Sequence, residues 1–131
     1  MYTTAAGAAF IERQLGRERD GEGLSLVITR RNRPVGCATL MTRRPFVADL
    51  GYWLVSDARG VGTGSRAVSQ LVAWALRQPA IDAVEAFVAD ENVASRRLLE
   101  TIGFRYAGRA QHQVNDLHAE LRVYRNDRPL A

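Results

Sequence analysis

A glycine-rich stretch, RGVGTGSRAV at residues 59–68, has the residue types that bind a phosphate group. Gly60, Gly62 and Gly64 alternate with other residues just before an apolar, alanine-rich run that predicts a helix. The first turn of a helix has unpaired backbone N–H groups and a positive dipole end, and glycines let an anion approach them closely. Arg59 adds a guanidinium group at the edge of the stretch. The pattern therefore predicts an anion-binding loop, with a glycine-rich turn that binds nothing as the alternative.

Two better-known phosphate-binding motifs do not fit this stretch. A dinucleotide-binding fold carries G-x-G-x-x-G after its first parallel strand and continues with several strand–helix units. Here the spacing is G-x-G-x-G, it follows three predicted antiparallel strands, and the remaining chain is too short for that fold. A P-loop needs a lysine, whereas all 18 basic side chains of this chain are arginine. The lack of lysine also excludes Schiff-base chemistry by this chain.

The composition is that of one globular domain, which we expect to span residues 1–131. Apolar residues make up 47% and charged residues 24% of the chain, which are ordinary values for a folded domain. The formal net charge of +4 suits a polyanionic small molecule. Because the arginines are dispersed along the chain rather than clustered, the sequence argues against nucleic acid as the partner.

The cysteine, histidine and apolar patterns argue against a disulfide-stabilised protein, a metal-binding protein and a membrane or secreted protein. Cys37 is the single cysteine, so it forms no internal disulfide, and its apolar neighbours suggest a small buried side chain. His112 and His118 do not have the spacing of metal ligands with each other or with Cys37, so we expect no metal. No apolar run is long enough to span a membrane, and the first residues lack a signal-peptide pattern. We therefore expect a cytoplasmic protein.

Periodicity and turn residues predict a mixed α/β fold (α+β) with the element order α-β-β-β-α-β-α-β-β. A helix over residues 8–23 precedes a meander of three strands over 24–30, 35–41 and 48–55, with turns at 31–34 and 42–46. Further strands are expected over 83–89, 104–111 and 119–125. Together they predict a central mixed sheet with flanking helices.

Two helices are expected in the second half of the chain. The first carries an apolar stripe, formed by Val68, Leu71, Val72 and Ala75, and ends before Pro79. The second lies over residues 92–104, with Leu98, Leu99 and Ile102 facing inward, Gly103 in the left-handed conformation after its end, and Phe104 in the core.

Residues 48–68 and 88–104 resemble the GNAT superfamily of acetyl-CoA-dependent N-acetyltransferases, and most of all the branch with the ribosomal-protein N-terminal acetyltransferases. The family's R/Q-x-x-G-x-G/A loop matches Arg59, Gly62 and Gly64. Its N-x-x-S…G-F signature matches Asn92, Ser95, Gly103 and Phe104. The resemblance extends from about residue 5 to residue 127, and implies a mostly antiparallel sheet in which one pair of strands splays apart.

The resemblance also implies a binding site for coenzyme A, with acetyl-CoA as the co-substrate and no metal. The loop would hold the pyrophosphate, and pantetheine would lie in the splay as an additional strand. The implied binding residues are Leu54, Val55, Arg59, Gly60, Val61, Gly62, Thr63, Gly64, Ser65, Asn92 and Ser95. Arg66, Arg96 and Arg97 are either phosphate ligands or solvated arginines.

The implied catalytic residues are Asp49 as the base and Ser95 as the acid. Asp49 occupies the place of the family's catalytic glutamate, with a solvated strand-end carboxylate as the alternative. The tyrosine that usually serves as the acid lies four positions before the Gly-Phe pair, and here that residue is Leu99. Ser95 matches the serine proposed as the acid in the ribosomal branch, with ordinary helix-start hydrogen bonding, capped by Asn92, as the alternative.

The sequence therefore predicts an enzyme that moves acetyl from acetyl-CoA to a primary amine, either a peptide N-terminus or a small molecule. The alternative is a coenzyme A-binding module with little or no catalysis, and the weakest hypothesis is RNA binding. Compared with the family, the given sequence is expected to begin at the second helix, so that either the true protein is longer or this is a shortened member without the first strand and first helix. The strand over residues 24–30 would then form an exposed sheet edge, which predicts a homodimer, with a monomer as the alternative.

Overall fold

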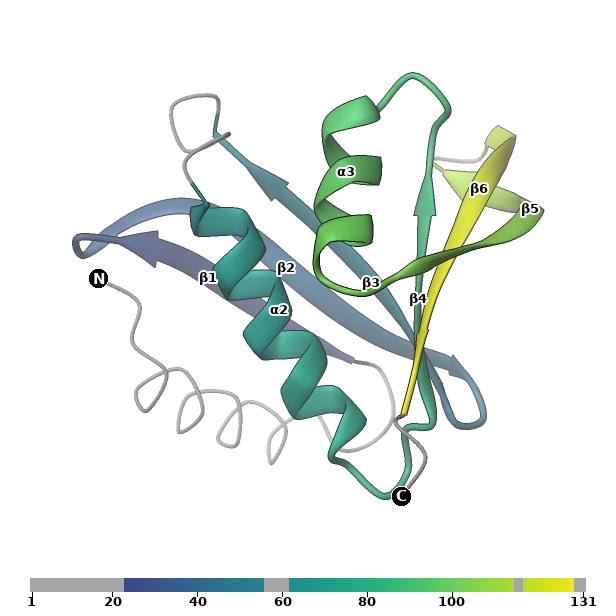
Figure 1. Cartoon of the computed structure of the whole chain (residues 1–131), viewed down its shortest axis with the longest axis horizontal. Coiled ribbons are helices and arrows are strands. Elements are labelled where there is room, and N and C mark those ends of the chain that lie inside the picture. Colours follow the sequence, from purple (N-terminus) through teal and green to yellow (C-terminus); the bar gives the residue numbers. More distant parts are fainter. Residues whose placement is uncertain (1–22, 56–61, 115–116, 129–131) are drawn as a thin grey trace.

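The computed structural model describes residues 23–55, 62–114 and 117–128 of the chain. The helix predicted over residues 8–23 lies outside the described residues except for Gly23. The remaining elements follow the predicted order, and they form a six-stranded sheet with the strand order β1-β2-β3-β4-β6-β5. Figure 1 shows two helices, α2 and α3, in front of this sheet.

The first three strands form the predicted antiparallel meander: β1 (Leu24–Arg30), β2 (Arg33–Arg44) and β3 (Val47–Leu54). Arg31 and Asn32 link β1 to β2 with positive φ angles of 52° and 65°, which suits the tight turn of a hairpin. β1 lies at one edge of the described sheet.

The break predicted at residues 42–46 is wrong in its extent. β2 continues to Arg44, which pairs with Val47, so that only Pro45 and Phe46 form the turn. The register between β2 and β3 shifts between Met41 and Arg44, and this irregularity absorbs the residues that the sequence assigned to a longer loop. Phe46 has a positive φ of 66°, as the second residue of such a tight turn requires.

The second half of the chain alternates strands and helices. Its elements are α2 (Thr63–Leu76), β4 (Ala83–Val88), α3 (Val93–Thr101), β5 (Arg105–Val114) and β6 (Leu117–Asp127). β4 pairs in parallel with β3 and antiparallel with β6. Since the other described pairs are antiparallel, the sheet is mixed and mostly antiparallel, as expected.

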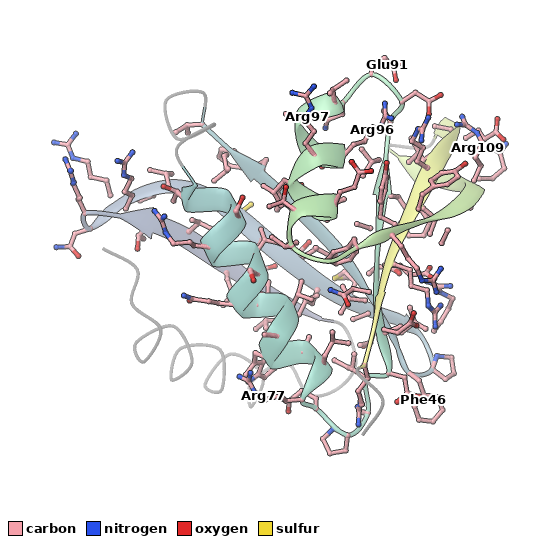
Figure 2. The ribbon with its side chains drawn as sticks, in the orientation of Figure 1. Phe46, Arg77, Glu91, Arg96, Arg97 and Arg109 are labelled. Carbon is pink, nitrogen blue, oxygen red and sulfur yellow. The ribbon has the colours of Figure 1, made fainter. Side chains whose placement is uncertain are left out.

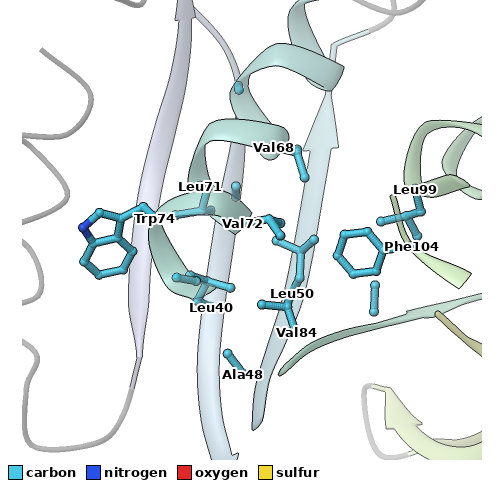
Figure 3. Close-up of a cluster of buried hydrophobic side chains, with 14 of the residues drawn as sticks. Leu40, Ala48, Leu50, Val68, Leu71, Val72, Trp74, Val84, Leu99 and Phe104 are labelled. Atoms are coloured by element: carbon cyan, nitrogen blue, oxygen red, sulfur yellow. The ribbon is translucent and has the colours of Figure 1, made fainter. Parts of the chain in front are cut away.

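The core lies between the sheet and the two helices (Figure 3). The predicted stripe of α2, Val68, Leu71, Val72 and Ala75, is buried against it. On α3, Leu99 is fully buried, Leu98 and Ile102 are partly buried, and Gly103 has a φ of 105° before Phe104 returns to the core. Within the described residues no helix is long and apolar enough to cross a membrane.

Strand alternation gives the sheet a second face, directed away from α2 and α3, which we call the outer face. Ala48 and Leu50 of β3 point into the core, so Asp49 points to the outer face, and Gly51 and Trp53 follow it there. The same alternation directs Glu85 of β4, which stands between the core residues Val84 and Ala86, to the outer face.

Candidate functional site

The parallel ladder between β3 and β4 ends before either strand does. Its last pair is Leu50 and Ala86, whereas β3 continues to Leu54 and β4 to Val88. Beyond this pair β3 stays paired with β2 as far as Leu54 opposite Gly36. β4 meanwhile stays paired with β6 as far as Val88 opposite Arg122. The two strands therefore diverge, and we call the opening between them the fork.

Gly36 allows the close approach of β2 and β3 beside the fork. A Cβ atom on Gly36 would collide with the carbonyl oxygen of Trp53 and would lie 3.0 Å from the Cα of Leu54. Only a glycine lets the backbones of β2 and β3 lie this close together. This close contact keeps the end of β3 with β2 rather than with β4.

α2 begins at the fork with an end that is suited to an anion. Gly62 is its N-cap residue in the left-handed conformation, with a φ of 82°, and no side chain caps this end. The first intrahelical bond is donated by the Arg66 amide to the Gly62 carbonyl, so the amides of Thr63, Gly64 and Ser65 precede it. The first turn contains no acidic residue. The positive end of the helix dipole is therefore available to a ligand.

In the structure, Gly62 and Gly64 are needed for reasons other than the close approach of an anion, which was the reason that the sequence suggested. Gly62 is required by its positive φ angle. Gly64 is buried, and a Cβ atom there would lie 2.5 Å from Leu54 Cδ1 and 3.2 Å from Leu98 Cδ1. Gly64 thus lets α2 pack tightly against β3 and α3, and this packing holds the helix end beside the fork.

A buried hydroxyl at the same helix end has no partner. Thr63 is 7% exposed, and its Oγ1 atom makes no hydrogen bond with any of the described residues. A buried polar group without a partner is costly, so such a group often marks a place where a ligand or water binds.

α3 contributes the other side of the site through its first turn. Asn92 is the N-cap residue, and its side-chain oxygen accepts a hydrogen bond of 3.2 Å from the Ser95 amide. The helix-capping role considered for Asn92 is therefore present. The hydroxyl of Ser95 lies 2.7 Å from the phenolic oxygen of Tyr52 on β3.

A cleft of about 720 Å³ joins these features. It is lined by residues from the end of β3, from the start of α2 and from α3: Tyr52, Trp53, Leu54, Gly62, Gly64, Ser65, Asn92, Ala94, Ser95, Arg97, Leu98 and Thr101. The structure thus brings together six of the predicted binding residues: Leu54, Gly62, Gly64, Ser65, Asn92 and Ser95, which is also the predicted acid.

Arg96 and Arg97 are neighbours in sequence but have different surroundings, and Figure 2 shows their side chains leaving α3 in different directions. Arg96 donates to the Asp90 carbonyl oxygen at 3.0 Å and contacts the Tyr124 hydroxyl at 3.4 Å. Arg97 lines the cleft. Of these two, only Arg97 is placed to contact a ligand in the cleft. On α2, the guanidinium of Arg66 lies over Gly62, within 3.2 Å of where a Cβ atom there would be.

The remaining predicted binding residues are not brought into this cleft or cannot be placed. Arg59, Gly60 and Val61 lie outside the described residues. Thr63 is buried behind the lining residues. The Val55 amide donates to the Val35 carbonyl at 2.8 Å, so a bond from Val55 to a ligand would use its carbonyl oxygen. Leu99, at the position of the family's tyrosine, is fully buried in the core.

Asp49 lies on the outer face, one residue before the ladder of β3 and β4 ends, and not in the cleft lining. Its carboxylate accepts a hydrogen bond of 2.9 Å from Arg44, whose guanidinium also donates to Glu85 at 2.7 Å. Arg125 donates to the other oxygen of Glu85 at 2.8 Å. The outer face beside the fork therefore carries a connected row of ion pairs.

Two pKa values in this region differ from their usual range. Burial raises the pKa of Glu85, but the hydrogen bonds from Arg44 and Arg125 lower it by more, so the carboxyl stays ionised. Burial raises the pKa of Tyr52, and the hydrogen bond with Ser95 only partly opposes this. At neutral pH the Tyr52 phenol is therefore protonated.

Tyr52, Arg44 and Glu85 were not predicted from the sequence as site residues. Tyr52 could have been found by strand alternation: if Asp49, Gly51 and Trp53 share one face, Tyr52 must share the opposite face with Leu54. Arg44 and Glu85 had no such signal, because their ion pairs depend on the parallel register of β3 and β4.

The chain belongs to the acetyltransferase (GNAT) family, since the acetyltransferase (GNAT) domain pattern matches residues 1–105. This is a family of acetyl-CoA-dependent N-acetyltransferases. The fold agrees, with its mixed sheet, its fork and its uncapped helix end.

A curated relative from Bacillus subtilis (strain 168), named "Putative ribosomal N-acetyltransferase YdaF", is 32% identical over 79 residues. The matched region covers 59% of this chain and 43% of that protein, so the chain corresponds to less than half of the relative's length.

Two solved structures share the fold. RimL, a ribosomal L7/L12 alpha-N-protein acetyltransferase in complex with coenzyme A, aligns with a TM-score of 0.74 at 19% identity over 91% of this chain and 70% of that chain. The microcin C7 self immunity acetyltransferase MccE, in complex with acetyl-CoA and AMP, aligns with a TM-score of 0.74 at 19% identity over 96% of this chain and 72% of that chain.

The first testable consequence concerns Gly36. Gly36→Ala forces β2 and β3 apart beside the fork, because the new methyl group collides with backbone atoms that cannot rotate away. We expect a loss of about 1–3 kcal/mol in the free energy of unfolding, measured by urea denaturation. Gly51→Ala is the control, since a Cβ atom there meets only the Thr39 side chain at 3.1 Å. Equal stabilities of the two variants would contradict this role of Gly36.

The second consequence concerns pH. The pKa of Glu85 is lower in the folded than in the unfolded chain, so its ion pairs stabilise the fold above the unfolded value of about 4.3. This stabilisation is lost as the pH falls through the folded-state pKa. We expect Glu85→Gln to lower the free energy of unfolding at pH 7 by about 2 kcal/mol, and the difference from wild type to shrink as the pH falls.

Glu120→Gln is the matched control for this measurement. Glu120 is an exposed carboxylate on β6 with a single partner, Arg109, at 3.3 Å. Its substitution should change stability little at any pH. A Glu85→Gln effect that does not vary with pH would contradict the assignment.

Proposed function

We propose that this chain transfers the acetyl group of acetyl-CoA to a primary amine, either the N-terminus of a peptide or a small-molecule amine. The single observation that carries the proposal is the meeting of the fork, the uncapped N-terminus of α2 and the first turn of α3 in one cleft. Membership of the acetyltransferase (GNAT) family supports the same reaction.

The residues of the cleft fit the chemical parts of acetyl-CoA. The amides of Thr63, Gly64 and Ser65 suit a pyrophosphate. Arg97 supplies a positive charge on the opposite wall. Pantetheine carries amide groups, and the backbone of β3 along the fork offers the matching hydrogen-bonding groups of a strand.

The acceptor amine is proposed to arrive from the outer face. Most residues of the cleft lie on the helix side of the sheet, with Trp53 of the outer face at the fork, where the sheet opens toward the other side. Asp49 stands on the outer face just before the fork, where a carboxylate can take the proton that the attacking amine releases, directly or through water. Its present partner Arg44 also holds Glu85, so Arg44 can remain paired when Asp49 turns to the amine.

The acceptor class follows from the basicity of amines. An α-amino group has a pKa near 7.7–8.0 and is partly neutral at pH 7, whereas a lysine-type amine near 10.4 is almost fully protonated. A site whose only proposed base is an ion-paired aspartate is better suited to the less basic amine. The names of the relative and of RimL, which refer to ribosomal proteins, support a peptide N-terminus as the first acceptor to test.

The test of the activity is direct. The protein is incubated with acetyl-CoA and a panel of peptides with free N-termini, polyamines and amino sugars, and the release of thiol is followed. The matched control is each peptide with an acetylated N-terminus, which should release none. If the protein binds coenzyme A but no acceptor gives turnover, the coenzyme A-binding module is the better account.

The binding site has a separate test. Ser65→Glu adds a carboxylate at the third position of α2, where it favours the helix dipole but repels a pyrophosphate. We expect coenzyme A to bind at least about tenfold more weakly, with the unliganded protein at least as stable as wild type. Ala73→Glu, on the exposed side of the same helix, makes the same charge change away from the cleft. Equal affinities of the two variants, measured by calorimetry, would exclude the helix end as the pyrophosphate site.

Association of two copies is a further part of the proposal. β1 lies at the edge of the described sheet, its residues alternate between buried and exposed, and Val27 is 52% exposed on the outer face. Unprotected strand edges pair readily with another chain. Light scattering over a wide dilution range distinguishes a homodimer from a monomer, and Val27→Lys should weaken a dimer formed through this strand.

A cytoplasmic location, the lack of a metal and a single domain over residues 1–131 stay predictions.

A further inference from the structure

Tyr52 was not predicted from the sequence as a site residue, but it makes a close polar contact in the cleft. It belongs to β3 beyond the last pair of the parallel ladder, and its phenolic oxygen lies 2.7 Å from Ser95 Oγ and 3.4 Å from the Ser95 carbonyl oxygen. Its ring is partly buried against the core. Strand β3 and helix α3, 43 residues apart in the chain, are thus joined by one pair of hydroxyl groups.

Either hydroxyl group could donate in the 2.7 Å contact. The Ser95 carbonyl oxygen can only accept, so the longer contact needs the Tyr52 hydroxyl as its donor. The phenol is protonated at neutral pH, and directing its one proton at Ser95 serves both contacts, with Oγ as the nearer acceptor. In this direction of the bond, the proton of Ser95 itself must point elsewhere. Both residues line the cleft, so the Ser95 proton is then available to a ligand there.

The cleft holds other hydroxyl groups, but among the described residues none of them contacts a second hydroxyl group. Ser65 is on the first turn of α2 and Thr101 is at the far end of α3. The helix position that the family resemblance assigns to a tyrosine acid is Leu99, which is fully buried here. Among the cleft-lining residues, Ser95 is therefore the helix hydroxyl with a second hydroxyl group within hydrogen-bond distance, and Tyr52 supplies that group.

We propose that Tyr52 is a positioning residue that acts through Ser95, aiming the Ser95 hydroxyl proton at the sulfur atom of the thioester. This inference rests on the proposed acetyl transfer. As the amine nitrogen bonds to the acetyl carbon, the carbon–sulfur bond breaks and the sulfur keeps the electron pair. Ser95 donates a hydrogen bond to that developing thiolate, which is stabilised most as the charge forms. The proton lost by the amine goes to Asp49 or water, the thiolate is later protonated by water, and Tyr52 keeps its proton.

The kinetic test uses Tyr52→Phe, which removes one oxygen atom and keeps the ring that packs against the core. We expect kcat to fall about tenfold while the KM for acetyl-CoA changes little, because the interaction strengthens only as charge develops on sulfur. Ser95→Ala should lower kcat at least as much. The double variant should be no slower than Ser95→Ala alone, since Tyr52 acts only through Ser95.

Tyr106→Phe is the matched control, because it removes a phenolic oxygen from an exposed residue of β5 outside the cleft lining. Its kcat should equal that of wild type. A wild-type kcat for Tyr52→Phe, or additive losses in the double variant, would overturn the inference.

A second measurement does not depend on turnover. A hydrogen bond from Ser95 to sulfur lowers the pKa of the thiol of bound coenzyme A, and this pKa can be followed by the ultraviolet absorbance of the thiolate. Ser95→Ala should raise the pKa of the bound thiol, and Tyr52→Phe should raise it part of the way. A packing role for Tyr52 would leave this pKa as in wild type, and that result would overturn the inference. If no amine is acetylated, the proposed reaction fails, and the thiol titration alone decides whether Tyr52 orients Ser95.

Discussion

The early separation of β3 from β4 is the constraint on which the rest of the site depends. Each of the two strands keeps its other neighbour: β3 follows β2, and β4 follows β6. Because a strand is bent by the partner it remains bonded to, the two diverge without any loss of pairing on their other edges. The start of α2 and the first turn of α3 then lie over the opening, and the packing of Gly64 between Leu54 and Leu98 holds them there.

The charges around this opening are divided between the two faces of the sheet. The helix side presents the end of a dipole with no acidic residue in its first turn, together with Arg97. The outer face carries alternating acids and arginines, in which Arg44 joins Asp49 to Glu85 and Arg125 joins Glu85 to Asp127. One face thus favours an anion, whereas the other is close to neutral and holds its carboxylates in fixed positions. Such a division suits two reactants of different charge.

Most of the fold was predictable because its local signals agree with one another. The strands over 24–30 and 83–89 are found within one residue, since alternation and turn residues mark the same limits. The turn at residues 42–46 was predicted too long, because Arg44 has no apolar signal and is kept in its strand by pairing with Val47. The motifs at the starts of α2 and α3 predicted some of the residues that line the cleft, namely Gly62, Gly64, Ser65, Asn92 and Ser95. Tyr52 was missed because its role depends on a contact with a helix far along the chain, which no local pattern encodes.

The sheet separates the helix side from the outer face, and the fork is an opening between the two sides. In the proposed reaction, a molecule on the helix side and another on the outer face meet at the fork. Each of them can therefore bind or dissociate while the other stays bound. In the proposed reaction only the amine of the acceptor has to reach the fork, so the fork limits the size of the part that is inserted and not the size of the whole acceptor. A bulky partner on the outer face therefore meets no steric limit beyond the first few atoms that it inserts.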